Sequence, residues 1–200
     1  ALYGGERANM VCDRVCAEGA DAKSLSLQKY GITEENGNLV ASGVSAHAST
    51  PEKGVNALEK MLACLSEKNA DIKHIYDVLF ADVFGKKKLH DETGYLSMSP
   101  NTVQYKDGKV CIVTDIRYPA TYTQEQICKL LNQFGAPYTF LHCQAPLFND
   151  KNGFLITALQ KVYQKHTGKA DAPLAIGGGT YARALKNGAG FGPQFADEPS

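Results

Sequence analysis

The chain has 200 residues, and its 21 Lys and Arg balance 21 Asp and Glu, so the formal net charge is zero. This length can bury one large core, or one domain together with part of another. A neutral chain without a concentrated basic surface excludes nucleic acid and anionic membranes as expected partners. No apolar run approaches the length of about 20 residues that crosses a bilayer, so no membrane-spanning helix is predicted.

The six cysteines stand at no spacing typical of a zinc finger. Cys12 and Cys16 form a C-x3-C pair, but no second pair follows to complete a tetrahedral site. The N-terminal stretch ALYGGERANM lacks the basic and apolar regions of a signal peptide. We therefore expect small buried thiols rather than disulfides, and we predict a cytoplasmic protein.

The first predicted elements are two strands and a helix. Residues 6–18 and 36–46 contain the apolar, β-like runs of strands. A helix is predicted from Pro51, with Thr50 as its cap and Glu52 near the positive end of the helix dipole. Apolar residues then recur at helical spacing and predict one buried face, made of Val55, Leu58, Met61, Leu62 and Leu65.

The middle of the chain predicts a hairpin between two helices. Residues 72–84 have a helical pattern, and residues 101–119 form two strands around Asp107-Gly108, a pair typical of a tight primed turn. Residues 121–134 predict a second capped helix, and residues 137–146 predict a further strand. This order indicates an α+β fold, a two-layer sandwich in which an antiparallel sheet carries helices on one face.

The composition changes after about residue 147. Residues 151–168 predict a third helix, and residues 173–195 are rich in glycine with short apolar strands. This tail does not complete the preceding sheet. We therefore predict one domain over residues 1–147 and part of a second domain over residues 148–200.

His47 is the first candidate for a functional residue. It follows the small residues Ser45 and Ala46, which let a ligand approach the imidazole, and it precedes a predicted helix start that favours anions. A histidine in this place can donate a hydrogen bond to an oxyanion. The alternative is a loop histidine without a role in chemistry.

Arg117 is the second candidate, at the end of the second hairpin strand in the sequence TDIRYP. Its planar guanidinium can hold a carboxylate through two parallel hydrogen bonds, as at the C-terminus of a peptide. The alternatives are a structural pairing with Asp115 or a charge on an edge strand.

The sequence AIGGGTYAR at residues 175–183 lets the backbone approach a ligand closely, with a helix start at Thr180. It matches neither a dinucleotide-binding fingerprint nor a Walker loop, and a plain turn is the alternative. Asn9 can bridge a carboxylate or carbonyl. The other histidines lie beside apolar or helical runs and predict structural roles.

Several of these stretches together resemble the M20 family of metallopeptidases. SGVSAHASTPEKGVNAL (42–58), GGERANMVCDRVCAE (4–18) and DIRYP (115–119) are similar to its ferredoxin-like lid domain. IGGGTYARALKNGAGFGPQF (176–195) is similar to a late segment of the α/β catalytic domain in the family's PepV-like, or Xaa-His, dipeptidase branch. The resemblance covers nearly the whole chain in the right order.

The resemblance implies a dipeptidase with two zinc ions and a glutamate base, and a role for each candidate residue. His47 would be the catalytic residue that stabilises the tetrahedral oxyanion. Arg117 would bind the C-terminal carboxylate of a dipeptide substrate, with Asn9. Gly179 and Thr180 would contact the substrate main chain. No metal ligand is assigned in this chain, because the family's ligands lie mostly before the lid or after the glycine-rich tail.

We therefore expect an excised part of a dipeptidase, inactive alone, whose partners are the rest of the catalytic domain and a dipeptide, with a homodimer as a further expectation. The glycine-rich segment is expected to be disordered, swapped between chains, or packed differently from the family. The alternative is a non-catalytic ligand-binding or oligomerisation module.

Overall fold

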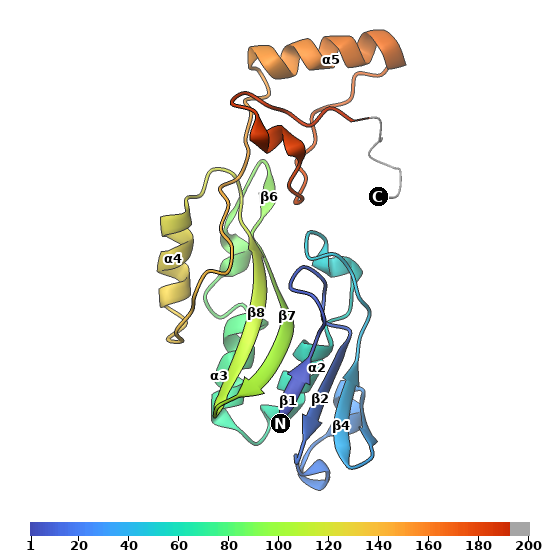
Figure 1. Cartoon of the computed structure of the whole chain (residues 1–200), viewed down its shortest axis with the longest axis vertical. Helices are drawn as coiled ribbons and strands as arrows, with labels where there is room; N and C mark the ends of the chain where they lie inside the picture. The colour runs from blue at the N-terminus through green and yellow to red at the C-terminus, as the bar shows by residue number, and fades with distance from the viewer. Residues whose placement is uncertain (193–200) are drawn as a thin grey trace.

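The computed structural model describes residues 1–192, and for Lys87 its backbone alone. The last residues of the predicted second domain and of the glycine-rich segment, from residue 193 on, lie outside this range. The described chain is elongated, with the sheet at one end and the helix α5 (Phe154–Thr167) at the other (Figure 1). No helix of residues 1–192 is long and apolar enough to cross a membrane.

A six-stranded antiparallel sheet forms the body of the protein, in the order β3-β4-β2-β1-β7-β8. Its strands are β1 (Leu2–Gly4), β2 (Arg14–Glu18), β3 (Ile32–Glu35), β4 (Asn38–Ser42), β7 (Ser97–Lys106) and β8 (Lys109–Arg117). A small hairpin, β5 (His90–Asp91) with β6 (Gly94–Tyr95), precedes β7. Asp107 and Gly108 join β7 to β8 with φ angles of 51° and 76°, which confirms the predicted primed turn.

The helices cover one face of this sheet. They are α1 (Leu27–Tyr30), α2 (Ala57–Leu65), α3 (Ala70–Leu79) and α4 (Gln124–Asn132). Leu58, Met61 and Leu62 of α2 are 0% exposed and pack on strands β1, β2 and β4. Burial of each such side chain contributes about 2 kcal/mol. A second cluster joins α4 to Ile116 of β8 and Val78 of α3. The α+β sandwich with helices on one face is therefore confirmed.

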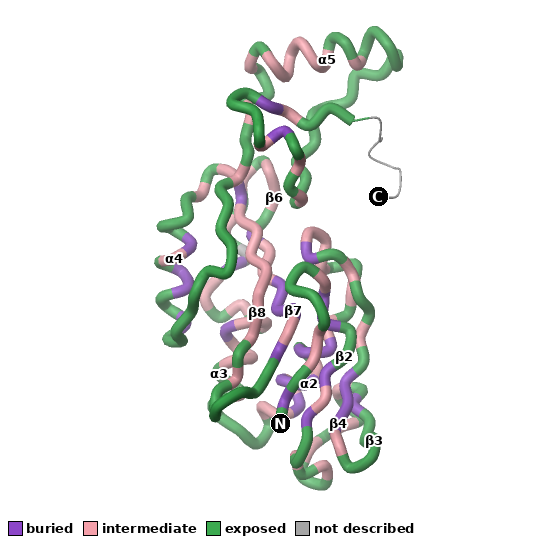
Figure 2. Tube along the Cα trace, viewed as in Figure 1, coloured by how far each residue is buried: buried purple, intermediate pink, exposed green. Residues whose placement is uncertain are grey.

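Among the described residues, none after Phe134 belongs to either cluster of buried apolar residues. Residues 137–150 form no strand, so the prediction of a strand at residues 137–146 is wrong. Short 3-10 turns complete the described chain, at η1 (Ala22–Ser24), η2 (Pro51–Lys53), η3 (Lys86–Lys88) and η4 (Tyr181–Ala184). Figure 2 shows that most of the chain beyond α4 is exposed.

The helix predicted from Pro51 begins later, at Ala57, and Asn56 rather than Thr50 caps it. The reason is a contact distant in sequence. Val44 and Val55 exchange two backbone hydrogen bonds of 2.8 and 2.9 Å, so Val55 is extended and a helix cannot pass through it. Pro51 starts only the short turn η2. Similarly, the strand predicted over residues 6–18 is confined to β2, and residues 5–13 form a loop.

The prediction of buried thiols holds for two of the six cysteines. Cys12 and Cys64 are buried, Cys16 and Cys128 are half-buried, and Cys111 and Cys143 are exposed. All six are free thiols in the structure. Burial raises the pKa of the Cys12 thiol to about 11, which keeps this group protonated and unreactive.

Candidate functional site

Two loops and the end of β8 meet at one end of the sheet. The loops are residues 5–13, which follow β1, and residues 43–56, which follow β4. They are joined by backbone hydrogen bonds: Val11 N–H donates to the Ala46 carbonyl at 2.8 Å, and Ala48 N–H donates to the Asn9 carbonyl at 2.9 Å. A β-bridge also pairs Met10 with His47. The structure therefore places the two candidates Asn9 and His47 in neighbouring loops.

One buried side-chain amide holds the first loop in place. Asn101 of β7 is 0% exposed, and its Nδ2 donates to the Ala8 carbonyl at 2.6 Å. Ser99 Oγ donates to Asn101 Oδ1 at 2.6 Å, so the amide has partners on both sides. Since an unpaired buried amide is costly, this arrangement fixes the backbone next to Asn9.

His47 is exposed, and its ring is oriented by Ser49. The backbone N–H of Ser49 donates to His47 Nδ1 at 3.1 Å, and Ser49 Oγ lies 2.7 Å from the same nitrogen. A backbone N–H can only donate, so Nδ1 is the acceptor and the proton of the neutral imidazole is on Nε2. No α-helix starts beside His47, so the helix dipole that the sequence suggested is not part of this site.

Arg117 and Asp115 lie on the face of β8 that the helices leave open, because side chains two residues apart share a face of a strand. Arg117 Nε and Nη2 donate to Asp115 Oδ1 and Oδ2 at 2.9 and 3.0 Å. The side chains are only 23% and 19% exposed. The structural pairing with Asp115, one of the alternatives for Arg117, is therefore present.

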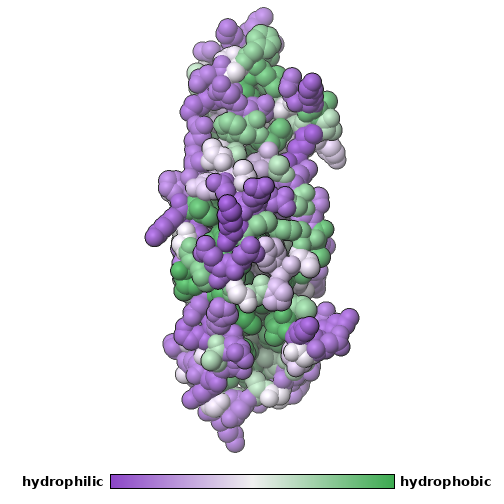
Figure 3. All heavy atoms as spheres, turned by 90° about the vertical axis from the view of Figure 1, so that its left-hand side faces the viewer, coloured by the Kyte–Doolittle hydropathy of each residue, from purple (hydrophilic) through white to green (hydrophobic). Residues whose placement is uncertain are grey.

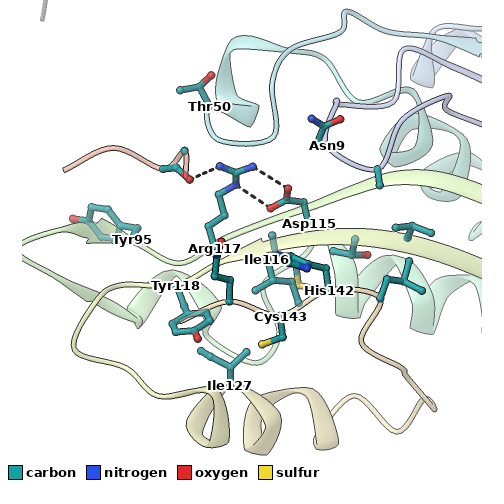
Figure 4. Close-up of a pocket in the computed structure, with 18 of the residues that line it drawn as sticks. Asn9, Thr50, Tyr95, Asp115, Ile116, Arg117, Tyr118, Ile127, His142 and Cys143 are labelled. Atoms are coloured by element: carbon teal, nitrogen blue, oxygen red, sulfur yellow. Dashed lines mark hydrogen bonds and ion pairs between the residues drawn. The ribbon is translucent and has the colours of Figure 1, made fainter. Parts of the chain in front are cut away.

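The third nitrogen of the Arg117 guanidinium, Nη1, contacts the glycine-rich segment. We call the part of the segment that it contacts, residues 177–180, the Gly turn. Arg117 Nη1 donates to the Gly177 carbonyl. Figure 4 shows the guanidinium between Asp115 and the Gly turn, directed toward the loops that carry Asn9 and Thr50. A Cβ atom on Gly177 would lie 3.1 Å from Ser49 Cβ, so the Gly turn also packs on the residue that orients His47.

One extended hollow contains most of the candidate residues. Its lining includes Asn9, Arg117, Gly179 and Thr180, together with Thr50, whereas His47 is not part of it. Thr180 precedes the short turn η4 rather than an α-helix. Arg183 lies in η4, and its Nη1 donates to the Ala145 carbonyl. Four of the five candidates thus line this extended hollow, and His47 lies in the loop that is paired with the Asn9 loop.

Two groups near the end of β8 have shifted pKa values. Burial raises the pKa of Tyr118, and the nearby Cys143 and Cys128 act in the same direction. Asp91, in the β5–β6 hairpin, accepts hydrogen bonds from Thr93 and Thr121 at 2.6 to 2.9 Å. Although burial opposes its charged form, these bonds hold the pKa of Asp91 well below its usual range. Asp91 therefore anchors the hairpin to the connection after β8.

The sequence interpretation missed three contributors to the site. Ser49 orients His47, Asn101 supports the loop of Asn9, and Thr50 lines the hollow. Asp115 was considered only as a structural partner of Arg117. For Asn101 the available signal was a polar residue within a strongly β-like run; the other two are plain loop residues whose role depends on contacts distant in sequence.

The described residues contain no group of three or more His, Cys, Asp or Glu that could hold a metal ion. This part of the chain therefore does not provide the donor set for the zinc ions that the family resemblance implies. The side chains at the opening are suited to hydrogen bonding and to binding an anion.

The fold is thus an open-faced α+β domain of the lid type, with a histidine, an arginine and a glycine-rich turn at one end of its sheet. Residues 35–134 match the family model described as the peptidase dimerisation domain of M20 peptidases. The chain belongs to the M20 peptidase family.

Two relatives of the chain carry the names of dipeptidases. The chain is 30% identical over 184 residues to the Beta-Ala-Xaa dipeptidase of Lactobacillus delbrueckii subsp. lactis, an alignment that covers 85% of this chain and 39% of the relative. It is 32% identical over 187 residues to the putative dipeptidase YtjP of Bacillus subtilis (strain 168), covering 86% of this chain and 40% of the relative. The chain therefore spans less than half the length of these relatives.

Proposed function

We propose that this chain is the lid and part of the catalytic domain of a zinc-dependent dipeptidase, and that it binds the substrate carboxylate and stabilises the oxyanion. The observation that supports this most strongly is the convergence of Arg117, the Gly turn and the His47 loop at one end of the sheet. Residues far apart in sequence meet there around an opening, on a domain whose named relatives are dipeptidases.

In this proposal His47 donates Nε2–H to the oxyanion that forms at the scissile carbonyl. Its neutral ring already has the required tautomer, because Ser49 N–H occupies Nδ1. A donor directed at developing charge stabilises the transition state more than the ground state. His47 is exposed, so it can reach a substrate bound between the lid and the rest of the intact protein when the two close.

Arg117 binds the C-terminal carboxylate of the dipeptide in this proposal, and Asn9 assists from the neighbouring loop. Both line the same hollow, and the guanidinium is directed toward the Asn9 loop (Figure 4). Gly179 and Thr180 contact the substrate main chain. Their part of the Gly turn is open, since a Cβ on Gly179 would meet only Arg183 and Gln144 at 3.6 Å or more.

We further propose the division into a lid at residues 1–147 and a catalytic-domain part at residues 148–200. It is supported by the helix α5, of which no residue is fully buried, and by the clusters of buried apolar residues, to which no described residue after Phe134 belongs. Figure 3 shows apolar side chains at the surface, and those exposed beyond α4 include Leu141, Phe154 and Tyr181. The rest of the catalytic domain, with the two zinc ions and the general base, would cover them in the intact protein.

The proposal places the protein in the cytoplasm and allows a homodimer. Six free thiols fit a reducing compartment. The match to a dimerisation domain, with β8 at an edge of the sheet, supports self-association. Equilibrium sedimentation of the full-length protein tests the homodimer. A mass that stays monomeric at micromolar concentration would contradict self-association.

The function is tested by dipeptide hydrolysis. The full-length protein that carries this chain, supplied with zinc, is expected to cleave dipeptides such as β-alanyl dipeptides. Longer peptides serve as the comparison. Binding of dipeptides without any cleavage would favour the alternative, a non-catalytic ligand-binding module.

A further inference from the structure

Each of the three nitrogens of the Arg117 guanidinium already has a hydrogen-bond partner without any substrate. Its Nε and Nη2 edge is paired with both oxygens of Asp115, and its Nη1 donates to the Gly177 carbonyl. These two kinds of partner are not equivalent. Asp115 is a charged, bidentate acceptor on the same strand, whereas Gly177 offers one neutral carbonyl from a distant segment.

We propose that Asp115 is the positioning residue of the carboxylate site: it fixes the guanidinium so that an incoming carboxylate replaces the Gly177 carbonyl at Nη1, while the pair with Asp115 stays intact. The inference rests on the proposed function, because it takes the C-terminal carboxylate of a dipeptide as the ligand.

Geometry and burial support this order of exchange. The Asp115–Arg117 pair uses two hydrogen bonds of 2.9 and 3.0 Å between side chains that are about four-fifths buried. Breaking it would leave a largely buried carboxylate without a partner, which is strongly unfavourable. Breaking the bond to Gly177 frees only a carbonyl in an exposed turn, which water can satisfy.

The strand fixes the direction of the pair. Asp115 and Arg117 are two residues apart on β8, and Ile116 between them is packed in the cluster with α4. Neither backbone position can rotate without disturbing that cluster. With Nε and Nη2 held by Asp115, the remaining N–H groups face the Gly turn and the loops of Asn9 and Thr50 (Figure 4).

The exchange also connects binding to the Gly turn. When a carboxylate takes Nη1, the Gly turn loses its bond to β8 and keeps its packing against Ser49. Binding of the substrate therefore changes the surroundings of Gly177 and Gly178. Both belong to the segment that is proposed to contact the substrate main chain.

The test is an NMR titration of this chain with a dipeptide that has a free C-terminal carboxylate, and with the amide of the same dipeptide as the control ligand. The carboxylate is expected to shift the Gly177 and Gly178 amide signals and to leave the Arg117 Nε signal in place. The amide is expected to bind at least about tenfold more weakly, because it cannot form a charge-assisted pair.

Asp115→Asn makes the test decisive. Coulomb attraction alone predicts tighter carboxylate binding, since this variant removes a negative charge beside Arg117. A positioning role of Asp115 predicts the opposite, about tenfold weaker carboxylate binding. Asn can accept only one of the two hydrogen bonds from Arg117, so the guanidinium is no longer held in its orientation. Asp115→Glu keeps the carboxylate and should recover part of the affinity. The matched control is Asp107→Asn, which makes the same charge change in the exposed β7–β8 turn.

Equal or tighter binding by folded Asp115→Asn would overturn the proposal, and so would a shift of the Arg117 Nε signal in the wild-type chain. No response of the wild-type chain to the carboxylate would overturn it as well. Peptide hydrolysis by the full-length protein is a separate readout, so failure of the proposed function is recognised independently.

Discussion

His47 and Ser49 form a local pair in which the backbone N–H of Ser49 donates to His47 Nδ1 at 3.1 Å. The Ser49 hydroxyl lies 2.7 Å from the same nitrogen. The pair leaves Nε2 as the only hydrogen-bond donor of the neutral imidazole. A histidine in an exposed loop thereby acquires a defined tautomer and orientation.

Replacing His47 should lower turnover without loss of stability. In the full-length protein, His47→Ala is expected to reduce kcat by about 100-fold, the effect of losing one oxyanion donor. The melting temperature should change little, because the ring is exposed. Ser49→Ala should cost less than His47→Ala, since the backbone N–H still holds Nδ1. The control is His166→Ala, in the last turn of α5; an equal loss there would contradict a specific role of His47.

The contact between the Gly turn and Ser49 can be tested with two neighbouring glycines. Gly177→Ala places a methyl group 3.1 Å from Ser49 Cβ, so the turn or the His47 loop must shift. We expect about a tenfold lower kcat/KM, because small displacements of catalytic groups are costly. Gly178→Ala is the matched control, since its Cβ would meet nothing within 4 Å. Equal values of kcat/KM for the two variants would show that the packing does not matter.

Asn101 should stabilise the whole domain. Asn101→Ala removes the donor to the Ala8 carbonyl and leaves Ser99 without its acceptor. We expect a loss of about 2 kcal/mol in the free energy of unfolding, measured with urea. Gln104→Ala, at an exposed position of the same strand, should change it by less than about 0.5 kcal/mol. Similar losses for both variants would rule out a special role for the buried amide.

Asp91 should make stability depend on pH in the acid range. Its pKa is lowered in the folded chain, so the unfolded chain, with a pKa of about 3.9, takes up the proton first as the pH falls. The stabilisation is fully present above about pH 5 and is lost as the pH falls through about 4 and below.

The measurement compares the melting temperatures of wild type and Asp91→Asn as a function of pH. The two curves should approach each other at the acid end, because a protonated Asp91 resembles Asn. Asp107→Asn, at an exposed position of the β7–β8 turn, is the control for the loss of one carboxylate charge. A gap for Asp91→Asn that is independent of pH would contradict this interpretation.

The parts of the fold that depend on neighbours in sequence could be predicted. Thr123 and Gln126 form a capping box at the start of α4, within residues 121–134 that predicted a capped helix, and Asp107-Gly108 forms the predicted turn. The start of α2 was misplaced because Val55 pairs with Val44, a contact that no local pattern encodes. For the same reason, the apolar alternation of residues 137–146 predicted a strand that finds no partner.

In the candidate site, too, features that depend on neighbours in sequence could be predicted, and contacts between distant segments could not. His47 and Arg117 could be chosen as candidates because their residue types and surroundings suit anion recognition, and the structure brings both to one end of the sheet. Asp115 could be considered as a partner of Arg117 because it is two residues away, whereas the other partners could not be foreseen. The contact of Arg117 with Gly177 and the pairing of the Asn9 and His47 loops join segments that are distant in sequence.

The most direct measurement of the central claim is kcat/KM of the full-length protein, with zinc, for a dipeptide and for its C-terminal amide. The wild type should prefer the free carboxylate, and Arg117→Lys should lose most of that preference because a single ammonium cannot replace the planar fork. An unchanged preference in Arg117→Lys, or no hydrolysis of dipeptides by the wild type, would contradict the account.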